Sequence, residues 1–404
     1  MNDFKSLKIG IFIGEGASYS WIWFVKTFSS LDLHEIYFLD EHDVISGKLS
    51  EYDCFIIPGG DPFPMADALE KEGLDAIKDF VSSGGIYLGV CAGTYLSMKF
   101  CENAMPWLNL VEMPINNYSP HPPEAIRMKY KYLVKYRDGY VFHPVRNSLV
   151  VGNDKFSFNA PLYGGPPMVA PKENRLLDYI DFDDKTLYLI DETIARNTML
   201  GCAAGIKVPF GEGWLYLFGP HFEHPHFNQA NQFLYDILSK HTPQASGPQQ
   251  PSMTELGGSE LRGWLKSIKG DVSSSRVIAN GMLNLRWKIG EKIWEDEKIS
   301  YFLDAVWKTI RSLQKYDVLP VCDPTGLEQN AKDIHDLLSE IRSLSKRGIG
   351  TEVQAKELIE ATKKLSEGLF NTYFCLKRNT WWSNGKNDRR HCEGGERLCV
   401  HTMR

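Results

Sequence analysis

Short apolar runs alternate with segments of helical periodicity over the first 240 residues. Four runs rich in β-branched and aromatic residues are bounded by turn residues: "KIGIFIG" (8–14), "EIYFLD" (35–40), "CFIIPGG" (54–60) and "IYLGV" (86–90). Before the fourth run, apolar residues recur at helical spacing as far as Gly84 and Gly85, a glycine pair that predicts the end of a helix. Strands joined by helical crossovers predict an α/β fold with a doubly wound, flavodoxin-like and mostly parallel sheet.

The pattern changes after residue 127. Residues 127–159 alternate apolar and polar side chains around "RDG" and "GND" turns, which predicts added antiparallel strands. Two later runs, "AAGIKVPFGEG" and "WLYLFGPHF", predict a hairpin across Gly211 and Gly213. This hairpin would bring His221 to the end of a strand.

Composition divides the rest of the chain. Residues 242–259 are rich in Pro, Gly, Gln and Ser and predict a flexible linker after a first domain of residues 1–241. Apolar residues at helical spacing predict an all-helical C-terminal domain over residues 260–377, and we expect a disordered tail over 378–404. Two helical faces carry this prediction: Ile334, Leu337, Leu338, Ile341 and Leu344 on one, and Ala355, Leu358, Thr362, Leu365 and Leu369 on the other.

Charge and cysteine content limit the class of protein. The 404 residues carry a formal net charge of −6, so we expect no nucleic-acid partner. The first apolar run is too short for a signal sequence or a membrane span, so we expect a cytoplasmic protein without a membrane partner. Eight scattered cysteines are typical of reduced, mostly buried thiols. We expect no cofactor and no metal.

Three turns follow predicted parallel strands and define the candidate site. They contain Glu15 and Gly16, then Gly59, Gly60 and Asp61, and finally Cys91. Ligands of doubly wound sheets bind beyond the carboxyl ends of the strands, where these turns meet. Glu15 and Asp61 are candidates for shaping substrate entry, and turn formation is the alternative role.

Cys91 is the candidate nucleophile. In "GVCAG" it stands between Gly89 and Gly93, and this spacing is typical of a strained strand-to-helix turn that presents the central side chain. The positive end of the following helix favours the thiolate. A buried structural thiol is the alternative.

His221 and Glu223 are candidates for activating Cys91. They are two residues apart at a strand end, so both side chains point the same way, and Glu223 can orient the imidazole. The backbone N–H groups of Gly60 and Ala92 are candidates for an oxyanion hole.

These motifs resemble the class I glutamine amidotransferase-like superfamily, most closely its biotin-protein ligase N-terminal domain branch. The resemblance covers residues 6–240 and rests on "IIPGGDPFPMADAL", "GGIYLGVCAGTYLS", "NAPLYGGPPM" and "GEGWLYLFGPHFE". It implies that Cys91, His221 and Glu223 form a catalytic triad, with Gly60 and Ala92 as oxyanion donors. In amidotransferases this triad releases ammonia from glutamine through a thioester.

The sequence departs from that superfamily at two places. Thr94 and Tyr95 stand where glutamine-using members usually have a His-Gln pair, and Phe222 replaces the usual proline between the His and the Glu. The use of glutamine is therefore left open. The chain has neither the Gly-Arg-rich loop of a biotin ligase nor a Walker-type phosphate loop, so we expect no biotin ligation by this chain itself.

The leading hypothesis is a Cys-His-Glu amidase or acyl-transfer hydrolase acting on a small amide or acyl compound. A non-catalytic scaffold, whose helical region recruits a protein partner, is the alternative from another class. A redox or glyoxalase-like enzyme, in which Glu15 would hold the cysteine, is the third. A zinc site of His391, Cys392, Cys399 and His401 is disfavoured by its spacing.

Overall fold

A computed structural model describes residues 7–99, 107–116, 134–136, 139–141, 143–248, 253–282, 285–289 and 292–392. The chain divides into two compact units. The first comprises Met1–Gln250 with Gly290–Lys292, and the second comprises Pro251–Ile289 with Ile293–Arg404.

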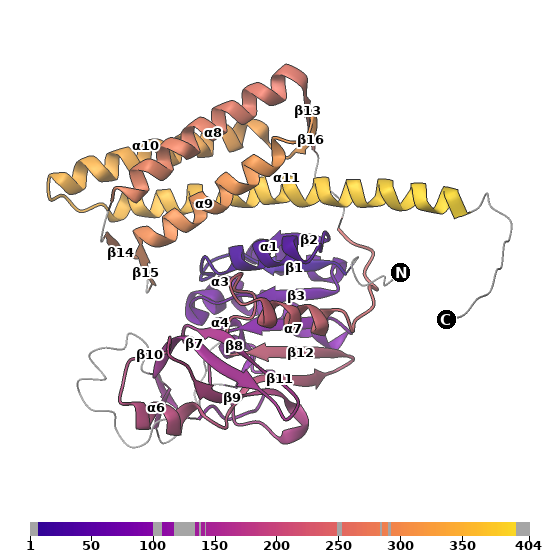
Figure 1. The fold of residues 1–404 in the computed structure, drawn as a ribbon, viewed down its shortest axis with the longest axis vertical. Coiled ribbons are helices and arrows are strands. Elements are labelled where there is room, and N and C mark those ends of the chain that lie inside the picture. Colours follow the sequence, from indigo (N-terminus) through magenta and orange to yellow (C-terminus); the bar gives the residue numbers. More distant parts are fainter. Residues whose placement is uncertain are drawn as a thin grey trace, which may run out of the picture. The chain divides into compact units, whose positions relative to one another are not determined.

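The first unit is built on one ten-stranded mixed sheet (Figure 1). Its parallel part has the order β2-β1-β3-β4-β12, formed by Ile36–Leu39, Ile9–Phe12, Cys54–Ile57, Ile86–Val90 and Gly213–Phe218. This is the flavodoxin-like order, with each crossover made by a helix or a longer excursion. The predicted α/β class is therefore confirmed.

Antiparallel strands extend the sheet beyond β12. They are β11 (Ala203–Phe210), β9 (Arg175–Phe182), β7 (Val145–Gly152), β10 (Leu187–Tyr188) and β8 (Ser157–Leu162). The alternating pattern of residues 127–159 predicted β7 and the start of β8, whereas β9 and β10 were not predicted. The hairpin β11–β12 turns at residues 211–212, as predicted. A separate short pair is β5 (Val134–Tyr136) with β6 (Gly139–Val141).

Alternate residues of the strands face opposite helical layers. Phe55 and Ile57 of β3 share one buried cluster with Leu69 and Ile77 of α3 (Pro62–Ser82). The other face carries an aromatic group in which Phe218 contacts Phe222 at 4.9 Å between ring centroids. The remaining helices of this unit are α1 (Trp21–Ser30), α2 (Glu41–Ile45), η2 (Lys48–Glu51), α4 (Ala92–Ser97), η3 (Lys172–Asn174), α6 (Glu192–Met199) and α7 (Asn228–Leu238).

The second unit is a helical bundle whose core follows the predicted faces. Its helices are α8 (Gly258–Asn280), α9 (Asp296–Leu313), α10 (Pro324–Lys346) and α11 (Glu352–Cys392), with α8 packed on α9 and α10, and α11 packed on α9 and α10. Ile334, Leu338 and Ile341 are buried on α10, and Leu358, Leu365 and Leu369 are fully buried on α11.

The structure of the C-terminal half differs from three predictions: the extent of the linker, the extent of the tail and the absence of strands. Four short strands accompany the helices: β13 (Thr254–Gly257) pairs with β16 (Val318–Val321), and β14 (Arg286–Ile289) pairs with β15 (Lys292–Glu295). Residues 254–259 of the expected linker thus lie in β13 and α8, because Leu256 is buried opposite Leu319. Helix α11 runs into the expected tail as far as Cys392, and residues 393–404 lie outside the described part.

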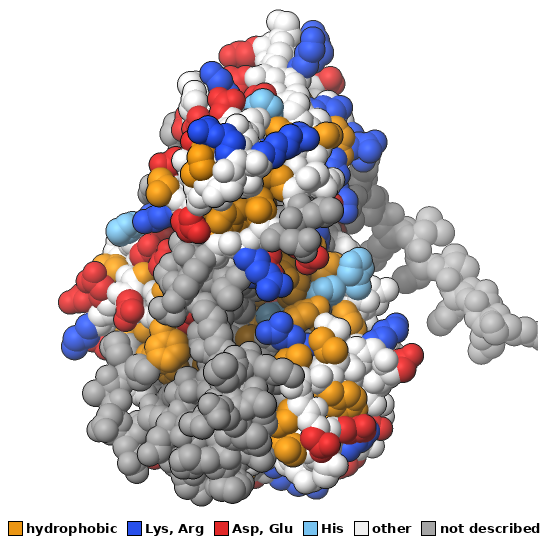
Figure 2. Space-filling view, turned by 90° about the vertical axis from the view of Figure 1, so that its left-hand side faces the viewer, with side chains coloured by type: hydrophobic (Ala, Val, Ile, Leu, Met, Phe, Trp, Pro, Cys, Tyr) orange, Lys and Arg blue, Asp and Glu red, His pale blue; other side chains and the backbone are white. Residues whose placement is uncertain are grey.

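Acidic and basic side chains are interspersed over the face drawn in Figure 2. Among the described residues, no helix is both long enough and apolar enough to cross a membrane. No group of three or more potential metal-ligating side chains occurs within the described ranges.

Candidate active site

Cys91 sits at the turn between β4 and α4 in a strained conformation. Its φ of 51° and ψ of −101° lie in a region that favours glycine, and its N–H donates to the carbonyl oxygen of Phe218 at 2.9 Å. Gly93 is required here, because a Cβ at this position would lie 2.2 Å from the backbone oxygen of Ile57. The elbow expected from the glycine spacing is therefore the observed local structure.

Strand pairing brings His221 to Cys91. The last residue of β12, Phe218, is paired with Val90, the residue before the cysteine. Three residues later, His221 is 3% exposed, and its ring interacts electrostatically with the Cys91 side chain. Gly59 leaves room for this ring, because a Cβ there would lie 2.5 Å from His221 Cε1.

Glu223 holds the far side of the imidazole. His221 Nδ1 lies 2.7 Å from Glu223 Oε1, and Glu223 is completely buried. Burial disfavours the charged imidazole, but the Glu223 charge, the hydrogen bond to Glu223 and the interaction with Cys91 outweigh it and raise the pKa of His221 to about 10. The ring therefore holds its proton at neutral pH, facing the sulfur.

Backbone contacts fix the segment that carries the pair. Thr27 Oγ1 of α1 donates to the carbonyl oxygen of Glu223 at 2.8 Å. Asn231 Nδ2 of α7 donates to the carbonyl oxygens of Phe222 and His224 at 2.7 and 3.0 Å. Neither Thr27 nor Asn231 was a sequence-based candidate, because side-chain-to-backbone contacts between distant segments leave no local signal.

The predicted oxyanion donors are available. Within the described ranges, the N–H groups of Gly60 and Ala92 donate to no carbonyl oxygen. Gly60 cannot carry a side chain, because a Cβ would lie 2.1 Å from the Gly16 oxygen. Both N–H groups therefore have no carbonyl acceptor among the described residues.

The two acidic candidates, Asp61 and Glu15, differ in burial and in their contacts. The Asp61 side chain caps α3 by accepting from the N–H of Phe63 at 3.2 Å, and the residue is 2% exposed. Glu15 is exposed, its N–H donates to Glu41 Oε2 at 3.1 Å, and no hydrogen bond joins it to Cys91 within the described ranges. Gly16 has a φ of 79°, and a Cβ there would lie 2.7 Å from the Asp61 oxygen. The geometry expected of a glyoxalase-like site, with Glu15 on the sulfur, is not the one observed.

Aromatic rings pack around His221. Trp23 and Tyr163 lie 5.2 and 5.6 Å from the His221 ring, between centroids, and Trp23 lies 4.4 Å from His224. Burial and the nearby His221 lower the pKa of His224 to about 3, so His224 stays neutral. Tyr163, 38% exposed, precedes Gly164 and Gly165. Neither Trp23 nor Tyr163 was a sequence-based candidate.

The Thr94 side chain has a structural role. Its fully buried Oγ1 lies 2.9 Å from the Gly89 oxygen and 2.7 Å from the Phe218 oxygen, so it bridges β4 and β12. Its single hydroxyl proton is shared between these two carbonyls. Thr94 therefore has no donor left for a substrate.

Comparison with known proteins gives one family match. Residues 48–111 match the family described as biotin-protein ligase, N terminal. The matched part runs from η2 past α4 and includes Gly59, Gly60 and Cys91, but it is far less than half of the chain and ends before His221. No curated protein matches the sequence.

Solved structures give weak likenesses. A protein of Thermoplasma acidophilum, proposed to be part of a GMP synthase, is 13% identical with a TM-score of 0.35, covering 58% of this chain and 92% of its own. A cytoplasmic protein of Salmonella typhimurium is 13% identical with a TM-score of 0.35, covering 59% of this chain and 100% of its own. A β-galactosidase of Bacillus circulans is 10% identical with a TM-score of 0.35, covering 62% of this chain and 34% of its own. The first unit is an α/β unit of flavodoxin-like strand order in which Glu223 contacts His221 near Cys91. This description depends on the sheet topology and the site geometry.

Proposed function

We propose that the first unit is a cysteine-dependent amidase or acyl-transfer enzyme of the glutamine amidotransferase-like class. The observation that carries this proposal is the arrangement at the strained elbow of Cys91, where Glu223 Oε1 lies 2.7 Å from His221 Nδ1 and the His221 ring interacts with Cys91. A nucleophile, a base and a group that orients the base are the minimum set for acyl transfer.

The proposed reaction follows from these positions. The Cys91 sulfur attacks the carbonyl carbon of an amide, and the resulting oxyanion accepts hydrogen bonds from the N–H groups of Gly60 and Ala92. His221 then gives its proton to the leaving nitrogen as the C–N bond breaks, so the amine departs and a thioester remains. Water, deprotonated by His221, attacks the thioester, releasing the carboxylic acid and the Cys91 thiol.

The site favours a substrate other than glutamine. Thr94 is committed to two backbone carbonyls, and the accessible ring beside His221 is the aromatic Tyr163. We propose an amide or thioester whose acyl part carries an apolar or aromatic group. The described cysteines, Cys54, Cys91, Cys202, Cys322 and Cys375, are free thiols, which supports a reducing, cytoplasmic location.

Selective alkylation tests the proposed nucleophile. Cys202 is a matched internal control, because Cys91 and Cys202 are each 8% exposed, while burial raises the pKa of the Cys202 thiol. At pH 7, iodoacetamide should label Cys91 at least about tenfold faster than Cys202, measured by peptide mass spectrometry. Equal rates at the two thiols would contradict a reactive Cys91.

Substrate trapping tests the acyl chemistry. Incubation with a panel of amides and thioesters, glutamine included, should leave an acyl mass on the Cys91 peptide, and Cys91→Ala should abolish both this adduct and hydrolysis. The matched variant Cys202→Ala should retain both. Hydrolysis that survives Cys91→Ala would overturn the mechanism.

A further inference from the structure

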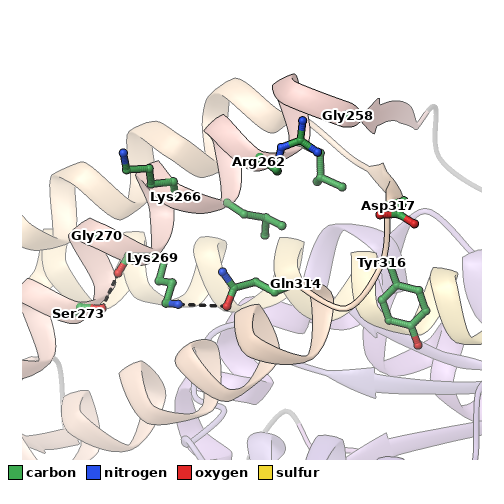
Figure 3. Close-up of a pocket in the computed structure, with 11 residues that line it drawn as sticks. Gly258, Arg262, Lys266, Lys269, Gly270, Ser273, Gln314, Tyr316 and Asp317 are labelled. Atoms are coloured by element: carbon green, nitrogen blue, oxygen red, sulfur yellow. Dashed lines mark hydrogen bonds between the residues drawn. The ribbon is translucent and has the colours of Figure 1, made fainter.

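A cavity lies entirely within the helical unit, and none of the predicted catalytic residues lines it. Its volume is about 490 Å³, within the range of small-molecule sites. One wall is α8 between Gly258 and Ser273, and the other is the turn of residues 314–317 between α9 and β16 (Figure 3).

Both ends of the cavity are defined by contacts. At one end, β13 pairs with β16, with Gly257 opposite Val318. At the other end, Lys269 Nζ of α8 donates to Gln314 Oε1 at 3.1 Å, and Lys269 also lies over the Trp307 ring, 5.2 Å from its centroid. Figure 3 shows Lys269 directed at Gln314, with Asp317 near the opposite end. Leu261 and Leu265, 2% and 5% exposed, supply apolar lining.

The lining is strongly positive. Arg262, Lys266 and Lys269 stand at i, i+4 and i+7 and therefore share one face of α8. Asp317 is the only acidic residue of the lining. Arg262 and Lys266 are exposed and form no ion pair with another described residue. Their charge is therefore available to an anionic ligand.

The spacing of the cations indicates more than one anionic group. Arg262 and Lys269 are separated by about 10 Å along the helix axis. A ligand with more than one phosphate matches cations spread over that length better than a single phosphate does. At the other end of the cavity, Leu261 and Leu265 are apolar and Asp317 is a hydrogen-bond acceptor. These residues match an uncharged group of the ligand that carries hydrogen-bond donors.

We propose that this cavity binds a small organic polyphosphate of the nucleoside di- or triphosphate kind. The phosphates contact Arg262, Lys266 and Lys269, and the nucleoside lies over Leu261 and Leu265 toward Asp317. This site is independent of the chemistry at Cys91, so either proposal can fail without the other.

Calorimetric titration of the full-length protein with ATP and with pyrophosphate tests the site. Both should bind at low salt, and raising the salt concentration should weaken both. The double variant Arg262→Glu/Lys266→Glu should lose at least about tenfold in affinity for each. A matched charge control, Lys332→Glu/Lys356→Glu, changes two exposed lysines elsewhere in the unit and should bind as the wild type does. Absence of binding, or equal losses in both double variants, would overturn the proposal.

A steric test leaves every charge in place. A Cβ at Gly270 or at Gly263 meets no atom within 4 Å, so α8 accommodates a side chain at either position, but only Gly270 lines the cavity. Gly270→Leu should fill the cavity and reduce ATP affinity at least about tenfold, whereas Gly263→Leu should not. Both should fold, because leucine favours a helix more than glycine does. Equal ATP affinity in these two variants would place the ligand elsewhere.

Discussion

Glu223 is the residue that determines the charge state of the candidate site. It is fully buried beside His221 and pairs through Oε1, and its charge favours a protonated imidazole in a place where burial alone would neutralise it. A protonated His221 next to the sulfur would stabilise a thiolate. In the proposed mechanism, the activation of Cys91 depends on this buried carboxylate, whose Oε1 lies 2.7 Å from His221 Nδ1.

The raised pKa of His221 predicts a pH-dependent stability. Because the folded pKa is about 10 against about 6.5 for an ordinary histidine, the folded state binds more protons across that window. The contribution is fully present below pH 6.5 and is lost as the pH rises toward 10. Urea unfolding between pH 6 and 10 should show a steeper loss of unfolding free energy for the wild type than for His221→Asn.

Glu223→Gln provides the matched comparison for that measurement. It keeps a side chain of the same shape but removes the charge that favours the imidazolium, so its pH slope should resemble that of His221→Asn. Identical slopes in all three proteins would contradict a raised pKa at His221.

At the scale of the element, the active-site elbow depends on how β4 and β12 are joined. Thr94 of α4 bridges the ends of these strands through the Gly89 and Phe218 carbonyls, and Cys91 N–H donates to the same Phe218 oxygen. Thr94, which stands where glutamine-using enzymes usually have another residue, therefore links two strands in this chain.

Thr94→Val should test that link. Valine has nearly the same shape but no hydroxyl, so we expect a loss of about 1–3 kcal/mol in the free energy of unfolding, measured by urea denaturation. Thr94→Ser keeps the hydroxyl and should lose clearly less. Equal stability of the valine and serine variants would show that the bridge contributes nothing.

At the scale of the whole molecule, the first unit carries its own core and its own site. The segment after α7 also belongs to it, because Asp53 accepts hydrogen bonds from the N–H groups of Gln244 and Ala245 at 2.6 and 2.7 Å. Lys8 Nζ donates to the Ala245 oxygen at 2.7 Å. The first part of the expected linker is therefore tied to the first unit.

Residues 1–250 produced alone should accordingly fold and should be alkylated at Cys91 at the full-length rate. Circular dichroism and peptide mass spectrometry measure these two properties. A truncation to residue 241 removes the contacts to Asp53 and should unfold at lower urea concentration. A 1–250 fragment that is unfolded, or whose Cys91 is unreactive, would show that the second unit is needed for the site.

The sequence by itself determined the parallel strands, the glycine elbow and the His221–Glu223 pair, because each depends on spacing within a few residues. Strand periodicity, a Gly-x-Cys-x-Gly turn and the two-residue spacing of His221 and Glu223 are local properties. The predicted position of this pair at a strand end was wrong, because β12 ends at Phe218 and both residues lie in the turn that follows it. Part of the antiparallel extension, β7 and the start of β8, was also predictable from alternation.

Only the tertiary structure decided which distant groups meet. The contacts of Trp23 and Tyr163 with His221, of Thr27 with Glu223 and of Thr94 with Phe218 join segments far apart in the chain. The short strands β13 and β16 depend likewise on a pairing between Leu256 and Leu319. Such contacts arise from burial and hydrogen bonding across the core, and neither spacing nor composition encodes a partner that is tens or hundreds of residues away.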